Sequence, residues 1–230
     1  MHRTLAPLAA AATLAAGTAS AAPLHFASDV GELNGSGASA RAALTLDGTM
    51  LKVRVVARGV EAGQVHLQHI HGTFDEAGAP TDAVTPPPSA DADGDGFVEI
   101  AEGAPFYGPV VVPLDDGAGA FPEPEGTGYD FMQVFDLSDA ATFAGEFGAA
   151  DALPLDLREI VIHGGSVPEG AGAGTEGSVD GSGGFKITLP VAAGEIVAVD
   201  APAPVPLPAA GFMLLAGLGG LGAMRRLRKH

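Results

Sequence analysis

The sequence contains no cysteine, and its 28 acidic residues far outnumber its 11 basic residues. Without cysteine the chain can form no disulfide bond and no thiolate-ligated metal site. The fold must therefore depend on its apolar core, with help from any metal that nitrogen and oxygen ligands hold. The shortage of positive charge excludes a nucleic-acid partner, because an acidic surface repels phosphate and attracts cations instead.

The N-terminus has the three parts of a secretory signal peptide over residues 1–21. Arg3 supplies a basic start, residues 5–16 form an apolar run, and the Ala-Ser-Ala sequence at 19–21 is a cleavage site of small residues. An alanine-rich helix of the mature domain is the alternative. We expect the protein to be exported and cleaved after Ala21.

The C-terminal segment combines an apolar stretch, residues 209–224, with a basic end, residues 225–230. A helix of this length spans about 24 Å, slightly less than a bilayer core of about 30 Å, and its basic end would stay in the cytoplasm. A Pro-rich linker, residues 201–208, precedes this helix. A short motif overlaps the junction: Val205, Pro206, Leu207, Pro208 and Ala209.

This tail resembles a VPLPA-CTERM sorting signal, a relative of PEP-CTERM tails. The resemblance implies a Gram-negative bacterium, a transmembrane helix at 209–224, and an exosortase-type sorting protease as a partner. It also implies that the protein is first anchored in the membrane and then reaches the cell surface or the extracellular space. A plain tail anchor is the alternative.

The body between these ends, residues 22–200, is strongly acidic. Arg3 and four basic residues of the tail fall outside it, so that six basic residues remain against 28 acidic ones, a net charge of −22. Such a body repels anionic membranes and favours cation binding.

Alternating apolar residues predict that this body is an all-β, antiparallel β-sandwich. Residues 51–57 place Leu, Val, Val and Ala on one face, and residues 184–191 alternate in the same way. Asp47 and Gly48 are expected at the centre of a type I′ hairpin turn, where both positions need positive φ. Residues 158–164 predict a further strand, and residues 136–147 a short helix capped by Ser138 or Asp139.

The sequence DADGDGFVEIAE, residues 91–102, has the spacing of a twelve-residue calcium loop at every fixed position. Calcium prefers a ring of oxygen ligands, and Gly96 stands where such a loop turns sharply. Side chains or backbone at six positions would supply the oxygens: Asp91, Asp93, Asp95, Phe97, Glu99 and Glu102. No helix is expected on either side of the loop, so we predict an isolated calcium loop inserted between strands; a solvated acidic loop is the alternative.

Three of the seven histidines lie in HLQHIHG, residues 66–72. His69 and His71 are two apart on an expected strand and therefore share a face, which suits two ligands of one copper or zinc ion. His66 has the opposite parity and is expected to face away. His163, near the end of the strand in EIVIHGG, is the third candidate ligand. A pair of polar histidines on the face of a sandwich is the alternative.

The segments GVEAGQVHLQHIHG, REIVIHGG and GSGGFKITLPV resemble the Cu/Zn superoxide dismutase architecture, and equally the CHRD domain, a β-sandwich family of no settled biochemical function. The resemblance implies a Greek-key topology, with His69, His71 and His163 as copper ligands and His66 as a structural histidine. Lys186 falls near the place of the basic residue that guides superoxide in the dismutases.

Two departures favour a binding module over an enzyme. No histidine lies between His71 and His163, where the dismutases place the histidine that bridges copper to zinc, and the acidic body would slow an anionic substrate. We therefore predict an exported, surface-associated CHRD-like module that binds calcium and copper, with no catalytic residue assigned. Extracellular matrix or surface proteins are its expected partners, and a copper-dependent, dismutase-like oxidoreductase without zinc is the alternative.

Overall fold

The computed structural model describes residues 21–201, and every structural statement below concerns this part of the chain. Residues 1–20 of the expected signal peptide lie outside the described residues. So do the sorting motif, the predicted transmembrane helix at 209–224 and the basic tail. Within residues 21–201 no helix is long and apolar enough to cross a membrane.

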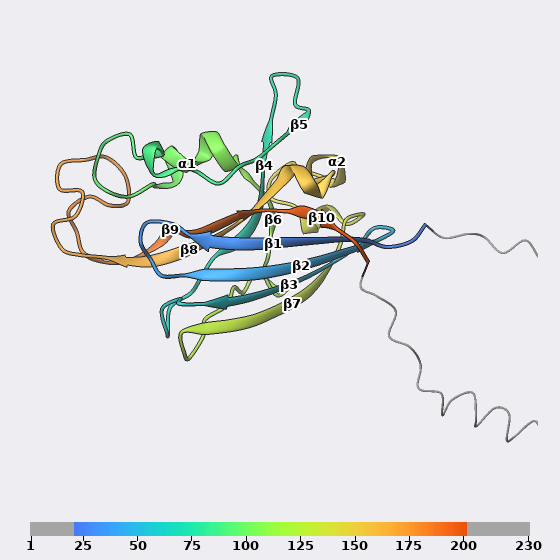
Figure 1. Ribbon diagram of the computed structural model, residues 1–230, viewed down its shortest axis with the longest axis horizontal. Coiled ribbons are helices and arrows are strands. Elements are labelled where there is room, and N and C mark those ends of the chain that lie inside the picture. The colour runs from blue at the N-terminus through green and yellow to red at the C-terminus, as the bar shows by residue number, and fades with distance from the viewer. Residues whose placement is uncertain (1–20, 202–230) are drawn as a thin grey trace, which may run out of the picture. The chain divides into compact units, whose positions relative to one another are not determined.

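Ten strands, all paired antiparallel, make up most of the regular structure (Figure 1). One group consists of β1 (Leu24–Glu32), β2 (Ser39–Asp47), β3 (Met50–Arg58), β7 (Gly128–Asp136) and β10 (Val197–Val199). The other consists of β4 (Gln68–Phe74), β5 (Pro80–Thr81), β6 (Val110–Pro113), β8 (Arg158–Val167) and β9 (Gly184–Glu195). The strand order is β5-β4-β8-β9-β1-β2-β3-β7, with β6 beside β4 and β10 beside β1. The prediction of an all-β, sandwich-like fold is confirmed.

The main core lies between these two groups of strands. Leu51, Val53, Val55 and Ala57 of β3 are all at most 2% exposed, as their alternation predicts. They belong to one apolar cluster with residues of β4 and β8 such as Ile70 and Ile160. Burial of one face of each strand therefore holds the sheet that carries the histidines against the sheet built by β1, β2, β3 and β7.

Two local expectations are wrong. Asp47 pairs with Met50, so that Gly48 and Thr49 form the centre of the turn; Gly48 alone has a positive φ, 60°, which is typical of a type II′ turn. In β9 the burial of alternate residues is interrupted at Ile187, which is 43% exposed and lies where the β8–β9 ladder shifts register.

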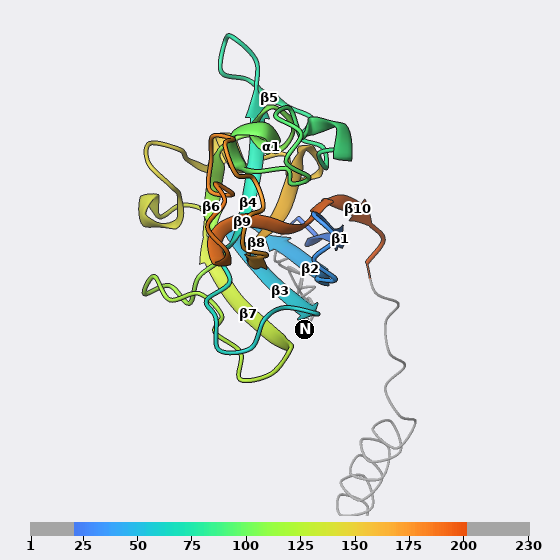
Figure 2. The ribbon, with the colours of Figure 1, turned by 90° about the vertical axis from the view of Figure 1, so that its left-hand side faces the viewer.

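The helices are short: η1 (Pro88–Ala90), α1 (Ile100–Tyr107), η2 (Ala140–Thr142), α2 (Ala149–Ala152) and η3 (Leu155–Leu157). The expected helix near residue 140 is the 3-10 turn η2, and its cap is Asp139, which accepts a hydrogen bond from the Ala141 N–H. The expectation that no helix adjoins the acidic loop is wrong: the 3-10 turn η1 ends directly before Asp91, and an α-helix adjoins the C-terminal side. There α1 begins, started by Glu102, whose carboxylate accepts from the Glu99 N–H at 3.0 Å. In both ribbon views α1 lies beside β4 (Figure 1, Figure 2).

Candidate metal centre

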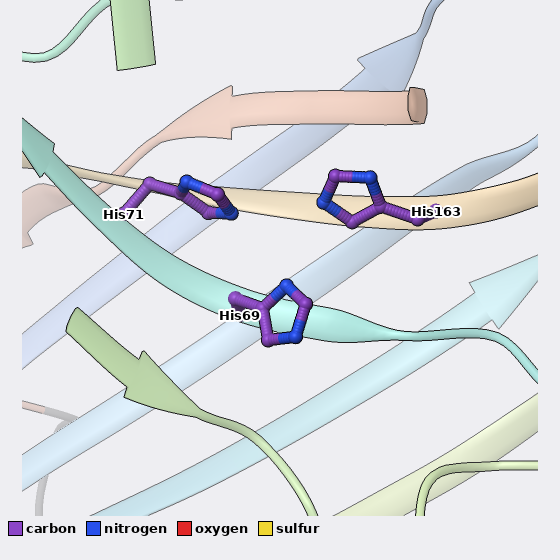
Figure 3. A group of neighbouring side chains, drawn as sticks. All are labelled: His69, His71 and His163. Atoms are coloured by element: carbon purple, nitrogen blue, oxygen red, sulfur yellow. The ribbon is translucent and has the colours of Figure 1, made fainter. Parts of the chain in front are cut away.

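Strands β4 and β8 bring His69, His71 and His163 together on one face of their sheet. In the β4–β8 ladder His69 is opposite Val161 and His71 is opposite Glu159, and residues opposite each other project to the same side. His163 follows two residues after Val161 and joins that side. Figure 3 shows the three rings arranged around a common point. Their centroids are 5.3 to 5.7 Å apart, and one nitrogen of each ring lies within 4.8 Å of the other two.

The histidine cluster, defined as these three residues, presents three buried nitrogens that have no hydrogen-bond partner: His69 Nδ1, His71 Nε2 and His163 Nε2. In two of the rings the other nitrogen is fixed by backbone. His71 Nδ1 donates to the Gly108 carbonyl oxygen at 2.8 Å, and His163 Nδ1 donates to the Thr188 carbonyl oxygen at 2.9 Å. Because these Nδ1 atoms carry the protons, the Nε2 atoms present free lone pairs. A carbonyl that holds the second ring nitrogen is a common device for orienting a metal-binding histidine.

Burial keeps all three rings neutral. It lowers the pKa of His69 to about 2, that of His71 to about 3 and that of His163 to about 4. Repulsion from His163 adds to the lowering of the pKa in both His69 and His71. Neutral imidazole is the form that binds metal, so the cluster remains able to bind metal far below the pH at which an exposed histidine becomes charged.

The free nitrogens face a pocket of about 160 Å³ with largely apolar walls. Tyr107 packs edge-on against His71 with the ring centroids 4.8 Å apart, and Phe121 packs edge-on against His69 at 5.4 Å. Ile100 lines the pocket and is itself 45% exposed, so it stands at the rim. The cluster thus lies in a small apolar recess and not on an open surface.

His66 is buried but lies outside the cluster. Its Nε2 is 2.9 Å from the Glu61 carbonyl oxygen and its Nδ1 is 3.2 Å from the His163 carbonyl oxygen. Its ring also contacts Phe185 edge-on. These contacts tie the segment before β4 to the strand that carries His163.

Several residues around the cluster could not be found from the sequence. Gly108 and Thr188 act through backbone carbonyls, which a side-chain pattern does not reveal. Tyr107 belongs to a helix that the sequence pattern did not predict. Glu159, 0% exposed and opposite His71, looks in sequence like an ordinary charged residue of a strand.

The acidic loop, residues 91–102, brings three of its predicted ligands together. Oxygens of Asp91, Asp93 and Asp95 lie within 4.8 Å of one another, and Asp95 Oδ2 is buried without a partner. Burial raises the pKa of Asp95, and the charges of Asp93, Glu99 and Asp91 raise it further. Gly96, with φ 93°, donates its N–H to Asp91 Oδ2 at 2.9 Å, so the loop turns as the motif requires.

The carboxylates of the two predicted glutamate ligands are not part of this group. Glu99 is 5% exposed, and its carboxylate accepts from Ser178 and from the Val179 N–H at 2.7 Å. Glu102 accepts from the Ala92 N–H at 2.6 Å, and Phe97 packs against a small apolar cluster. The structure therefore gathers three aspartates and uses both glutamates to tie the loop to its surroundings.

No protein-family model matches this sequence, and no curated protein matches it. The case for a metal site rests on the geometry of this chain.

Proposed function

We propose that this protein is an exported metal-binding module that holds copper at the histidine cluster and calcium at the acidic loop, and that it binds these ions without catalysing a reaction. One observation carries the copper proposal: the three histidines lie together, each with a buried ring nitrogen that has no hydrogen-bond partner, and in His71 and His163 that nitrogen carries a free lone pair. A buried acceptor without a partner is costly, and a cation removes that cost for all three nitrogens at once.

The donor set selects the ion. Three neutral imidazoles suit copper or zinc, whereas calcium prefers the oxygens that the acidic loop offers. We assign copper because the resemblance described above places copper at these three histidines. The two sites differ in chemistry, so each can be tested separately.

To test the copper site, residues 22–200 are loaded with copper, the excess metal is removed, and the copper content per chain is measured. Wild type is expected to retain one copper ion per chain, and a His69→Ala, His71→Ala double variant none. His25→Ala is the control, because His25 lies outside the cluster and its Nδ1 is 3.3 Å from Thr45 Oγ1. Copper retention by the double variant equal to that of wild type would remove the cluster as the site.

The test of the calcium site is calorimetry with a Glu102→Gln variant. The proposal has Glu102 turn from its backbone partners to the ion, and glutamine lacks the charge for that role. Calcium affinity is expected to fall at least about tenfold, which corresponds to about 1.4 kcal/mol. Glu146→Gln changes an exposed glutamate outside the loop and is expected to bind calcium as wild type does. Equal calcium affinities of wild type and both variants would exclude the acidic loop as the calcium site.

The proposal also includes a Greek-key form of the sandwich that is CHRD-like or dismutase-like. It further includes export, processing at residues 205–209 by an exosortase-type protease and anchoring through residues 209–224. The expected partners are matrix or surface proteins. This part of the proposal is supported by the order of the sequence segments and by the acidic body. Fractionation of the native cell with N-terminal sequencing tests it. Recovery of a cytoplasmic chain that still begins at Met1 would contradict export.

A copper-dependent oxidoreductase is the second candidate, favoured by the three-nitrogen centre itself. Two features weigh against it. Among the described residues no fourth histidine joins the cluster, and Lys186, the residue expected to guide superoxide, donates to Ser182 Oγ at 2.7 Å and lies 3.4 Å from Asp180. Rapid dismutation by the copper-loaded body, abolished in the His69→Ala, His71→Ala variant, would favour the enzyme.

A further inference from the structure

The walls around the histidine cluster carry no ionisable group besides Tyr107 and the histidines themselves. The lining residues Leu67, Ile100, Ala104, Pro109 and Val110 are apolar, and Thr188 adds a neutral side chain. The buried carboxyl group of Glu159, on the same face of β8, accepts a hydrogen bond from Thr85 and is not part of the pocket wall. No carboxylate therefore lines the recess in which a metal ion would lie.

The ligands add no negative charge either. His71 and His163 donate their second ring proton to carbonyl oxygens, which are neutral, so neither ring gains anionic character from a carboxylate partner. Three neutral nitrogens thus hold the ion in a recess of about 160 Å³.

The cost of taking an ion out of water rises with the square of its charge, so a divalent ion costs roughly four times as much as a monovalent ion of similar size. The exposed carboxylates of the acidic body favour the divalent ion, but they act through water and salt, which screen charges beyond about 8 Å. The apolar wall acts at contact and is not screened. The cost of taking the ion out of water therefore decides which oxidation state of copper binds more tightly.

We infer that the histidine cluster is a site for monovalent copper, Cu⁺, which it binds in preference to Cu²⁺. This inference rests on the proposed copper function and adds to it the charge state that the pocket selects. A site of this kind raises the reduction potential of its copper and suits storage or transfer of Cu⁺ better than repeated oxidation and reduction.

The experiment measures Cu⁺ and Cu²⁺ affinities of residues 22–200 by competition with chelators specific for each ion, and the reduction potential by spectroelectrochemistry. We expect Cu⁺ to bind at least about 100-fold more tightly, so that the potential lies about 120 mV above that of copper in water. Cu²⁺ affinity equal to or above that for Cu⁺ would overturn the inference and leave the proposed copper site standing. Binding of neither ion would overturn both.

A matched pair of variants tests the cause. Thr188 lines the pocket, and its carbonyl oxygen, which holds His163, belongs to the backbone and is kept in any substitution. Thr188→Asp adds a carboxylate to the wall, whereas Thr188→Asn adds the same shape without charge. We expect Thr188→Asp to lower the potential by about 60 mV or more, a tenfold shift toward Cu²⁺, and Thr188→Asn to leave it within about 20 mV of wild type. Equal potentials in both variants would contradict the charge argument.

Discussion

Thr85 donates its hydroxyl hydrogen to one oxygen of Glu159, while the other oxygen, Oε2, is buried without a partner. Burial, with smaller contributions from the charges of Glu195 and Asp82, raises the pKa of this carboxyl group to about 7 against the lowering by the Thr85 hydrogen bond. Glu159 is therefore about half-protonated near neutral pH, although glutamate side chains are usually exposed to solvent. A carboxyl group that resists ionisation on the histidine-bearing face has a measurable consequence for stability.

The first prediction concerns Glu159→Gln. Because the pKa is higher in the folded than in the unfolded protein, the folded state binds more protons between pH 4.5 and 7, and stability falls as pH rises through this window. Between pH 5 and pH 8 we expect wild type to lose roughly 2–3 kcal/mol more than the variant, whose amide does not titrate. Urea unfolding at the two pH values measures this difference. Identical pH dependence in the two proteins would mean that Glu159 ionises normally.

The second prediction concerns acid and the metal-free protein. The three histidines have pKa values of about 2, 3 and 4 when folded, so below pH 6.5 the unfolded chain takes up three protons that the folded state does not. Glu159 acts in the opposite direction: above pH 4.5 it holds about one proton in the folded protein that it lacks in the unfolded chain. Stability should therefore fall by about 3 kcal/mol per pH unit between pH 6 and 5.

A variant that lacks one of the three histidines tests this prediction through the slope of stability against pH. His163→Asn removes one of the titrating groups and should reduce the loss by about 1.4 kcal/mol per pH unit. A steep loss that persists in His163→Asn would have to come from other groups.

The third prediction concerns Asn34, which joins three segments. Its Nδ2 donates to the carbonyl oxygens of Val98 at 3.0 Å and Pro190 at 2.9 Å, and its Oδ1 accepts from the Val98 N–H at 2.7 Å. The side chain thus pairs with Val98 of the acidic loop as a neighbouring strand would. It also has φ 59°, a conformation that asparagine tolerates better than alanine.

Substitutions separate these two roles of Asn34. Asn34→Gly keeps the backbone conformation and loses the bonds, for an expected loss of about 2–3 kcal/mol, and Asn34→Ala should lose about 1 kcal/mol more through strain. Asn34→Asp keeps the shape without the two donated bonds and should weaken calcium binding less than Asn34→Ala does. Calorimetric titration and thermal unfolding measure both effects. Equal stability of the glycine and alanine variants would show that the strain is negligible.

The sequence was sufficient for features that follow from side-chain periodicity. Alternation identified the core face of β3, and a spacing of two placed His69 and His71 on one face. It was not sufficient where the backbone decides. The hairpin turn is displaced by one residue, α1 depends on a capping contact of Glu102, and the carbonyl groups of Gly108 and Thr188 orient two histidines through backbone atoms that a side-chain pattern does not reveal.

The last prediction follows from the position of α1 between the two proposed metal sites. Its first turn contains Glu102 of the acidic loop, and its C-terminal end places Tyr107 against His71 and supplies the Gly108 carbonyl oxygen to His71 Nδ1. Gly108 has φ 77°, and a Cβ there would lie 2.0 Å from the Gly72 carbonyl oxygen, so this end of the helix is fixed against β4. A helix of only eight residues thus joins Glu102 to the groups that contact His71.

We expect calcium to tighten zinc binding at the histidine cluster at least about fivefold, and zinc to tighten calcium binding by the same factor, because coupling between two sites is reciprocal. Zinc serves as the probe because it has no redox change, and a chromophoric competitor reports its affinity. Glu102→Gln should abolish the coupling without altering zinc affinity in the absence of calcium, and Glu146→Gln should leave the coupling intact. Direct repulsion between the two cations would weaken binding instead, so mutual weakening would show that charge outweighs the helix, and independent affinities would show that α1 transmits nothing.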